Sequence, residues 1–89
     1  MNYRTIEEEK SVSEKIDSHI KENARIEDAW EALKWSLSHS PHVGLEMEIK
    51  GRFLYKQAKS SVTPAIRVLY TYDDNLVNIK AVDLVEDEE

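Results

Sequence analysis

The chain lacks cysteine altogether, has only two glycines and two prolines, and contains no long apolar run. Without cysteine it forms neither disulfides nor thiolate sites, and a small domain without such links is typical of the cytoplasm. A membrane-spanning helix needs about 20 apolar residues, and no stretch approaches that length. The first residues also lack the basic and apolar parts of a secretory signal. We therefore expect a cytoplasmic protein that does not enter the membrane.

The length of 89 residues indicates one domain, which we place at residues 1–85. Apolar residues make up 40% of the chain and charged residues 34%. The regular spacing of the apolar residues favours a folded protein. Residues 86–89 are all acidic, and we expect them to form a disordered tail.

The net charge of −6 is spread unevenly along the chain. Residues 1–48 contain 6 basic and 11 acidic side chains, for a net −5. Residues 49–82 contain 6 basic and 2 acidic side chains, for a net +4, and residues 83–89 contain 5 acidic ones, for a net −5. The overall sign argues against a dedicated nucleic-acid-binding protein. The basic middle part is either a binding surface or an ordinary solvated face.

The first half of the chain carries the spacing of two amphipathic helices. Ser11 and Glu14 match a capping box, and apolar residues recur every four positions behind them to about Asn23. The next apolar stripe has spacings of three and four and ends before Pro41, which cannot continue a helix. Trp35 lies off this stripe. The short link between the two segments predicts an αα-hairpin.

In the second half of the chain the period changes to two, which predicts strands. The expected strands run from 52 to 59, from 65 to 72 and from 76 to 85, with turn residues between them. A further edge strand is possible within residues 2–9. These elements predict an α+β fold of the order β-α-α-β-β-β, in which the helical hairpin packs on a small antiparallel sheet.

The hairpin formed by the last two strands has a register that the apolar pattern favours. If Asp74 and Asn75 form a two-residue loop, Thr71 opposes Asn78 and Arg67 opposes Val82. One face of the sheet then collects the apolar side chains Ile66, Val68, Tyr70, Tyr72, Val77, Ile79 and Ala81. The other face is half polar. It carries Arg67, Leu69, Thr71, Asn78, Lys80 and Val82, with Arg67 and Lys80 as near neighbours.

Four features together resemble the RelE/ParE superfamily of bacterial toxins from type II toxin–antitoxin systems. They are the order of the elements, the helix exit at Ser40-Pro41, the step Lys50-Gly51-Arg52, and the run Ile66-Arg-Val-Leu-Tyr-Thr-Tyr-Asp-Asp74. For RelE-type members the resemblance implies ribosome-dependent cleavage of messenger RNA. It also implies a cognate antitoxin as partner, the ribosome or RNA as target, and no cofactor.

The same resemblance implies the residues of a phosphate-facing site. Arg67 falls on the strand arginine of the family, and Lys56 falls near a family lysine, so both are candidate catalytic residues. Such cations stabilise the charge that develops on phosphate oxygens. We add four candidate binding residues in the same basic region: Lys59, Lys80, Arg52 and Tyr55. Tyr55 has two interpretations, packing in the core or stacking beside Lys56, and Arg67 has a second one, an ion pair with Asp83 or Glu86.

The end of the chain departs from the RelE pattern. RelE-type enzymes carry further basic residues and an aromatic or histidine acid/base there, whereas the segment from Val82 to Glu89 is acidic. Acidic side chains beside a phosphate site repel the ligand. We therefore favour a protein that acts by binding, with a degraded nuclease centre. The alternatives are an active endoribonuclease that uses Lys56, Lys59 and Arg67, and an interaction module that binds a partner by strand addition or helix docking.

Other chemistry finds little support in the sequence. The chain has three histidines, His19, His39 and His42, and Pro41 separates the last two, so they do not have the spacing of a zinc site. No serine lies in a nucleophile context, and no glycine-rich phosphate loop is present. The sequence leaves open whether the protein is an enzyme and which oligomeric state it has.

Overall fold

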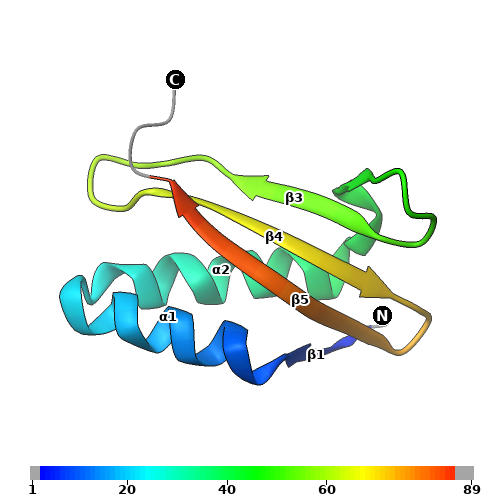
Figure 1. The fold of residues 1–89 in the computed structure, drawn as a ribbon, viewed down its shortest axis with the longest axis horizontal. Coiled ribbons are helices and arrows are strands. Elements are labelled where there is room, and N and C mark those ends of the chain that lie inside the picture. Colours follow the sequence, from blue (N-terminus) through cyan, green and yellow to red (C-terminus); the bar gives the residue numbers. More distant parts are fainter. Residues whose placement is uncertain (1–2, 86–89) are drawn as a thin grey trace.

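A computed structural model, which describes residues 3–85, has a five-stranded mixed sheet with two helices (Figure 1). The elements in chain order are β1 (Thr5–Glu8), α1 (Lys10–Glu22), α2 (Arg25–His39), the 3-10 turn η1 (Pro41–Val43), β2 (Leu45–Glu46), β3 (Phe53–Gln57), β4 (Ala65–Tyr72) and β5 (Leu76–Val85). The strand order is β1-β5-β4-β3-β2, and neighbours are antiparallel except for β1, which runs parallel to β5. The predicted α+β fold is confirmed, with the short strand β2 and the parallel pairing of β1 as additions.

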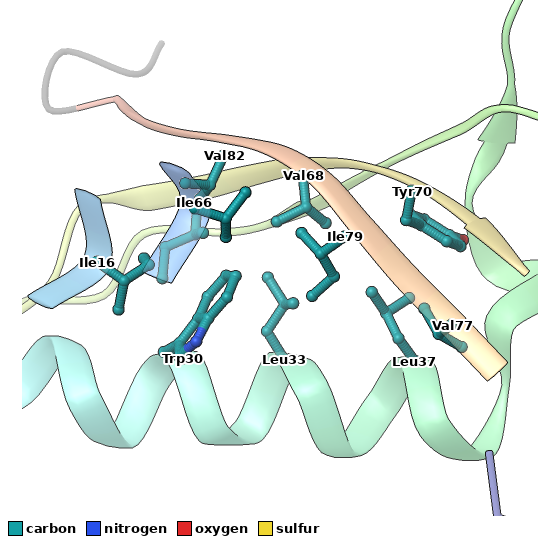
Figure 2. Packing of buried hydrophobic residues seen from close by; sticks show 11 residues of the cluster. Ile16, Trp30, Leu33, Leu37, Ile66, Val68, Tyr70, Val77, Ile79 and Val82 are labelled. Atoms are coloured by element: carbon teal, nitrogen blue, oxygen red, sulfur yellow. The ribbon is translucent and has the colours of Figure 1, made fainter. Parts of the chain in front are cut away.

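The helical hairpin covers one face of the sheet, and both helices lie on the same side of it (Figure 1). Three residues of α2, namely Trp30, Leu33 and Leu37, point toward the strands (Figure 2). They are buried, as is Ile16 of α1. They pack against the sheet residues Ile66, Val68, Tyr70, Val77, Ile79 and Val82. The second face of the sheet is left without a helix.

The first helix begins differently from the sequence prediction, and the capping box does not form. The helix starts at Lys10, so Ser11 lies inside it, and its N-cap Glu9 makes no side-chain cap hydrogen bond. The amide of Glu9 donates to the carbonyl of Ile79 at 3.1 Å. Because of this bond, the pairing of β1 with β5 extends to Glu9, the residue directly before the helix. The strand pairing therefore determines where α1 starts.

The predicted helix break and helix end are both confirmed. The first helix ends at Glu22, and the side-chain oxygen of Asn23 accepts a hydrogen bond from the amide of Arg25 at 3.1 Å. Such a bond from asparagine to the backbone two residues on is typical of a turn. The second helix ends at His39, and Pro41 opens a 3-10 turn because it has no amide hydrogen for the helical ladder.

A buried tyrosine holds the segment that connects α2 to the sheet. The Tyr70 hydroxyl donates to the carbonyl of Pro41 at 2.6 Å and accepts from the amide of Gly44 at 3.0 Å. A Cβ on Gly44 would lie 2.2 Å from this hydroxyl, so only glycine fits the close approach. Burial raises the pKa of Tyr70 to about 12.

The register of the β4–β5 hairpin is as predicted near its turn and shifts by one residue further along. Thr71 opposes Asn78, and the amide of Asp73 donates to the carbonyl of Leu76 across the two-residue loop. Beyond Tyr70 the pairing is interrupted by a β-bulge in which Lys80 is the extra residue.

Because of the bulge, three residues lie in positions that differ from the predicted register. Arg67 opposes Asp83 rather than Val82. Val82 is buried in the core, where the sequence placed Ala81, and Ala81 is exposed on the other face. A one-residue shift exchanges the faces of all the side chains that follow it.

The expected disordered tail at residues 86–89 lies outside the described residues, as does Asn2. None of the helices within residues 3–85 combines the length and the apolar character needed to cross a membrane.

Candidate binding surface on the open face of the sheet

The face of the sheet without helices displays a row of four apolar side chains that crosses four strands. The register pairs Leu45 with Leu54, Leu54 with Leu69, and Leu69 with Ala81. Directly opposed residues share a face of the sheet, so the four side chains lie side by side. Leu54 and Leu69 are half-buried, whereas Leu45 is 71% exposed. We call these four residues the leucine row.

A row of charged side chains runs next to the leucine row. Lys56 opposes Arg67, and Arg67 opposes Asp83. We call these three residues the charged row. The Arg67 guanidinium donates to the Asp83 carboxylate at 2.5 Å, and the Lys15 ammonium lies 3.9 Å from the same carboxylate. The hydrogen bond from Arg67 lowers the pKa of Asp83, and the positive charges of Arg67 and Lys15 act in the same direction.

A shallow hollow of about 180 Å³ lies where the two rows meet. Leu54, Leu69 and Ala81 line its apolar side, and Arg67 and Asp83 line its polar side. An apolar strip beside a charged rim is the usual composition of a protein-binding patch. The strip is small, so it fits one or two inserted side chains.

The structure brings together only two of the six predicted site residues, Arg67 and Lys56, which are direct cross-strand neighbours on the open face. Lys80 lies at the bulge and forms an ion pair with Glu9 at 3.1 Å, beside β1. The predicted proximity of Lys80 to Arg67 is therefore wrong. The cause is the bulge, because it places Ala81 and not Lys80 opposite Leu69.

The other three predicted residues lie elsewhere. Lys59 belongs to the loop after β3, beside Asn23. Arg52 precedes β3, and its carbonyl accepts from the amide of Met47 at 2.7 Å. Tyr55 opposes the buried Val68 and packs against the core, which agrees with the core interpretation of this residue.

Sequence reasoning missed the leucine row as a unit and assigned Arg67 no definite partner. Leu45 stood in a segment without a predicted structure, and the row exists only through the pairing of β2 with β3. The alternation within each strand was visible, but the alignment between strands was not. Asp83 is one of the two partners predicted for Arg67, and the bulge places it directly opposite Arg67, where the two side chains form a hydrogen bond.

The described residues, 3–85, include no group of three histidine or carboxylate side chains placed to hold a metal ion. The three histidines of the chain lie in α1, α2 and η1, and His39 lines a hollow that also includes Tyr55 of β3. The open face thus offers cations, one paired carboxylate and apolar surface.

Comparisons with protein-family models, with curated proteins and with solved structures gave no match for this chain. The fold is compatible with the RelE/ParE architecture without establishing membership.

Proposed function

We propose that this protein acts by binding a protein or ribosomal target through the open face of its sheet, as a divergent relative of the RelE/ParE toxins that does not cleave RNA. In this proposal it works in the cytoplasm, and a cognate antitoxin controls it. The observation that carries the proposal is the pairing of Arg67 with Asp83 beside an exposed leucine row. The leucines would supply apolar contact area, and the charged row would set orientation.

The occupied guanidinium of Arg67 argues against the nuclease alternative. A phosphate at the open face would have to compete with Asp83 for Arg67, and the carboxylate would repel it. No histidine lies in β3, β4 or β5 to act as acid or base. The pairing of Arg67 and the lack of a histidine in these strands both favour a target that is recognised by its shape and by apolar contacts.

The test is induced expression in a bacterial host, with growth and the integrity of messenger RNA measured together. We expect the intact protein to arrest growth while messenger RNA stays whole. Leu69→Asp should relieve the arrest, because it puts a charge into the leucine row. Ser11→Asp, which adds the same single negative charge at an exposed position in the first turn of α1, serves as the control and should still arrest growth.

Two results would contradict the proposal. Cleaved messenger RNA that becomes whole again in Arg67→Ala and Lys56→Ala would establish the endoribonuclease instead. Normal growth in the presence of abundant, folded protein would show that the protein is not a toxin. The remaining alternative would be a non-toxic module that binds a partner protein. Circular dichroism of each purified variant verifies that it is folded.

A further inference from the structure

We infer a second interaction site, independent of the proposed function: a groove along α2 that binds an extended peptide segment of a partner protein, in which an apolar side chain is flanked by basic residues. One wall of this groove is α2. The other wall is β1 at one end and α1 at the other, and these two elements follow each other in the chain (Figure 1). We call it the α2 groove.

The end of the α2 groove beside β1 is aromatic. A hollow of about 620 Å³ lies there, lined by Tyr3 and Ile6 on one side and by Trp35 and His39 on the other. Trp35 is 64% exposed and Tyr3 is 59% exposed. The His39 ring contacts both, with ring centroids 4.0 Å from Trp35 and 4.1 Å from Tyr3. Exposed tryptophan and tyrosine beside a hollow are typical of the residues that dominate binding energy.

The same end presents a strand edge that is occupied at Arg4, whose amide donates to the Ser38 carbonyl and whose carbonyl accepts from the Ser38 hydroxyl, and that is open beyond it. The amide of Glu9 donates to Ile79 of β5, and the amide of Thr5 donates to Asn75, the residue directly before β5. Because backbone groups alternate along a strand, those of Ile6 and Glu8 point away from β5. No backbone hydrogen bond within residues 3–85 joins them to another segment on that side. The edge of β1 can therefore accept an added strand.

The other end of the α2 groove is acidic. A second hollow of about 270 Å³ shares Glu31 and Lys34 with the first and is also lined by Glu8, Asp17 and Glu27. Its one cation, Lys34, is already bound by Glu8 at 3.0 Å and by Glu31 at 2.9 Å. Burial alone would lower the pKa of Lys34, but the hydrogen bonds to Glu31 and Glu8, together with the negative charges of these two residues, raise it. The remaining negative charge favours lysine or arginine on the occupant.

The length of the groove fits a short extended segment. From Glu27 to His39 the helix rises about 18 Å at roughly 1.5 Å per residue, and an extended chain covers that distance with about five or six residues at roughly 3.3 Å each. A second copy of this chain, docked through the same groove, would place two acidic surfaces against each other. The charge therefore favours a basic segment of another protein over a second copy docked groove to groove.

The test uses a displayed library of random eight-residue peptides, selected on the intact protein, and the affinity of each selected peptide is then measured for the intact protein and for its variants. We expect selected peptides with an aromatic or aliphatic residue between lysines or arginines. Trp35→Ala should weaken their binding about tenfold or more, as the loss of a dominant contact does. Glu31→Lys should weaken it as well. The matched control, Ile49→Ala, removes an exposed apolar side chain outside both the groove and the leucine row and should leave the affinity unchanged.

Strand addition gives a second readout that a simple apolar contact would not. A bound peptide should slow the hydrogen exchange of the Ile6 and Glu8 amides, measured by NMR. Leu69→Asp should bind the peptides normally, so a failure of the proposed function leaves this inference intact.

The inference is overturned if no selected peptide depends on Trp35, if the selected peptides are acidic, or if exchange at Ile6 and Glu8 does not change. It is also overturned if sedimentation shows a dimer that Trp35→Ala dissociates, because the occupant would then be a second copy.

Discussion

The two faces of the sheet are built from the same strands, yet they differ in almost every physical respect. In β4 the residues that face the helices, Ile66, Val68 and Tyr70, are fully buried. Their neighbours Arg67 and Leu69 face the other way and keep contact with solvent. The covered face is continuous and apolar, whereas the open face alternates a leucine row with a charged row.

This difference separates stability from binding. Burial of apolar area supplies most of the free energy of folding, so the covered face carries the stability. The open face contributes little to it, because its ion pairs are solvated and its leucines are only half covered. Residues on the open face can therefore change with small effects on folding, and a partner can bury what the helices do not.

The largest contrast between the faces should come from truncating one leucine on each. Leu33→Ala removes a fully buried side chain between α2 and the sheet, and it should lower the free energy of unfolding by about 2–5 kcal/mol. Leu69→Ala on the open face should lower it by less than about 1 kcal/mol. Urea unfolding followed by circular dichroism measures both. Equal losses would mean that the open face is part of the folding core.

The second effect concerns the buried hydroxyl of Tyr70. Tyr70→Phe leaves the Pro41 carbonyl and the Gly44 amide without their partner, which should reduce stability by about 1–3 kcal/mol. Gly44→Ala should also destabilise the protein, because its Cβ would collide with the hydroxyl. Phe53→Leu, which changes a half-buried ring without a hydroxyl, is the control and should have a smaller effect.

Tyr70 also predicts how stability changes at high pH. Its pKa is raised from 10.0 to about 12 in the folded protein, so the folded state holds a proton that the unfolded chain releases earlier. The stabilisation is fully present below pH 10 and is lost as the pH rises toward 12. Tyr70→Phe should weaken this loss. An identical loss of stability in wild type and variant between these pH values would show that Tyr70 does not cause it.

The third effect tests the link between β1 and α2. The Glu8 carboxylate accepts hydrogen bonds from Ser13, from the Trp30 indole and from Lys34, at 3.0–3.3 Å. Glu8→Ala removes all three, and we expect a loss of about 1–2 kcal/mol, together with faster amide exchange in β1. Glu7→Ala on the opposite, exposed side of the strand should change neither. Unchanged exchange in Glu8→Ala would mean that β1 is held by its pairing with β5 alone.

The smallest effect on stability, and the sharpest on binding, should come from Asp83→Asn. An exposed ion pair contributes at most about 1 kcal/mol, so the folded protein should hardly change. The pKa of Asp83 is lowered in the folded protein from its ordinary value of 3.8. The ion pair therefore stabilises the fold above about pH 3.8, and this stabilisation is lost as the pH falls through the lowered pKa. The variant frees Arg67, so it should bind a polyanion such as heparin more tightly at low salt. Unchanged heparin binding would show that Asp83 does not mask Arg67.

Much of the fold was predictable from the sequence because it depends on local periodicity. The strand from Ala65 to Tyr72 and the end of the second helix before Pro41 were both located by residue type. The start of α1 was not, because the bond from Glu9 to β5 overrides the capping signal of Ser11 and Glu14. Strand β2 was missed since two paired residues leave no periodic pattern.

The candidate site was only half predictable. Arg67 and Lys56 were chosen on resemblance, and the structure makes them cross-strand neighbours, while their function stays a prediction. The position of Lys80 could not be foreseen, because a bulge inserts one residue without a special residue type to mark it. Trp35 was seen to lie off the apolar stripe, but the hollow beside it forms only when Tyr3 and β1 lie against α2.

The sequence by itself determined the α+β class, the helical hairpin and the alternation that gives each strand a buried and an exposed side, since these follow from side-chain chemistry at fixed local spacing. The tertiary structure alone decided the bulge, the partner of Arg67, the leucine row and the α2 groove. Each of these depends on which residues from distant parts of the chain lie opposite one another. A shift of one residue between strands reverses such contacts without changing any local pattern.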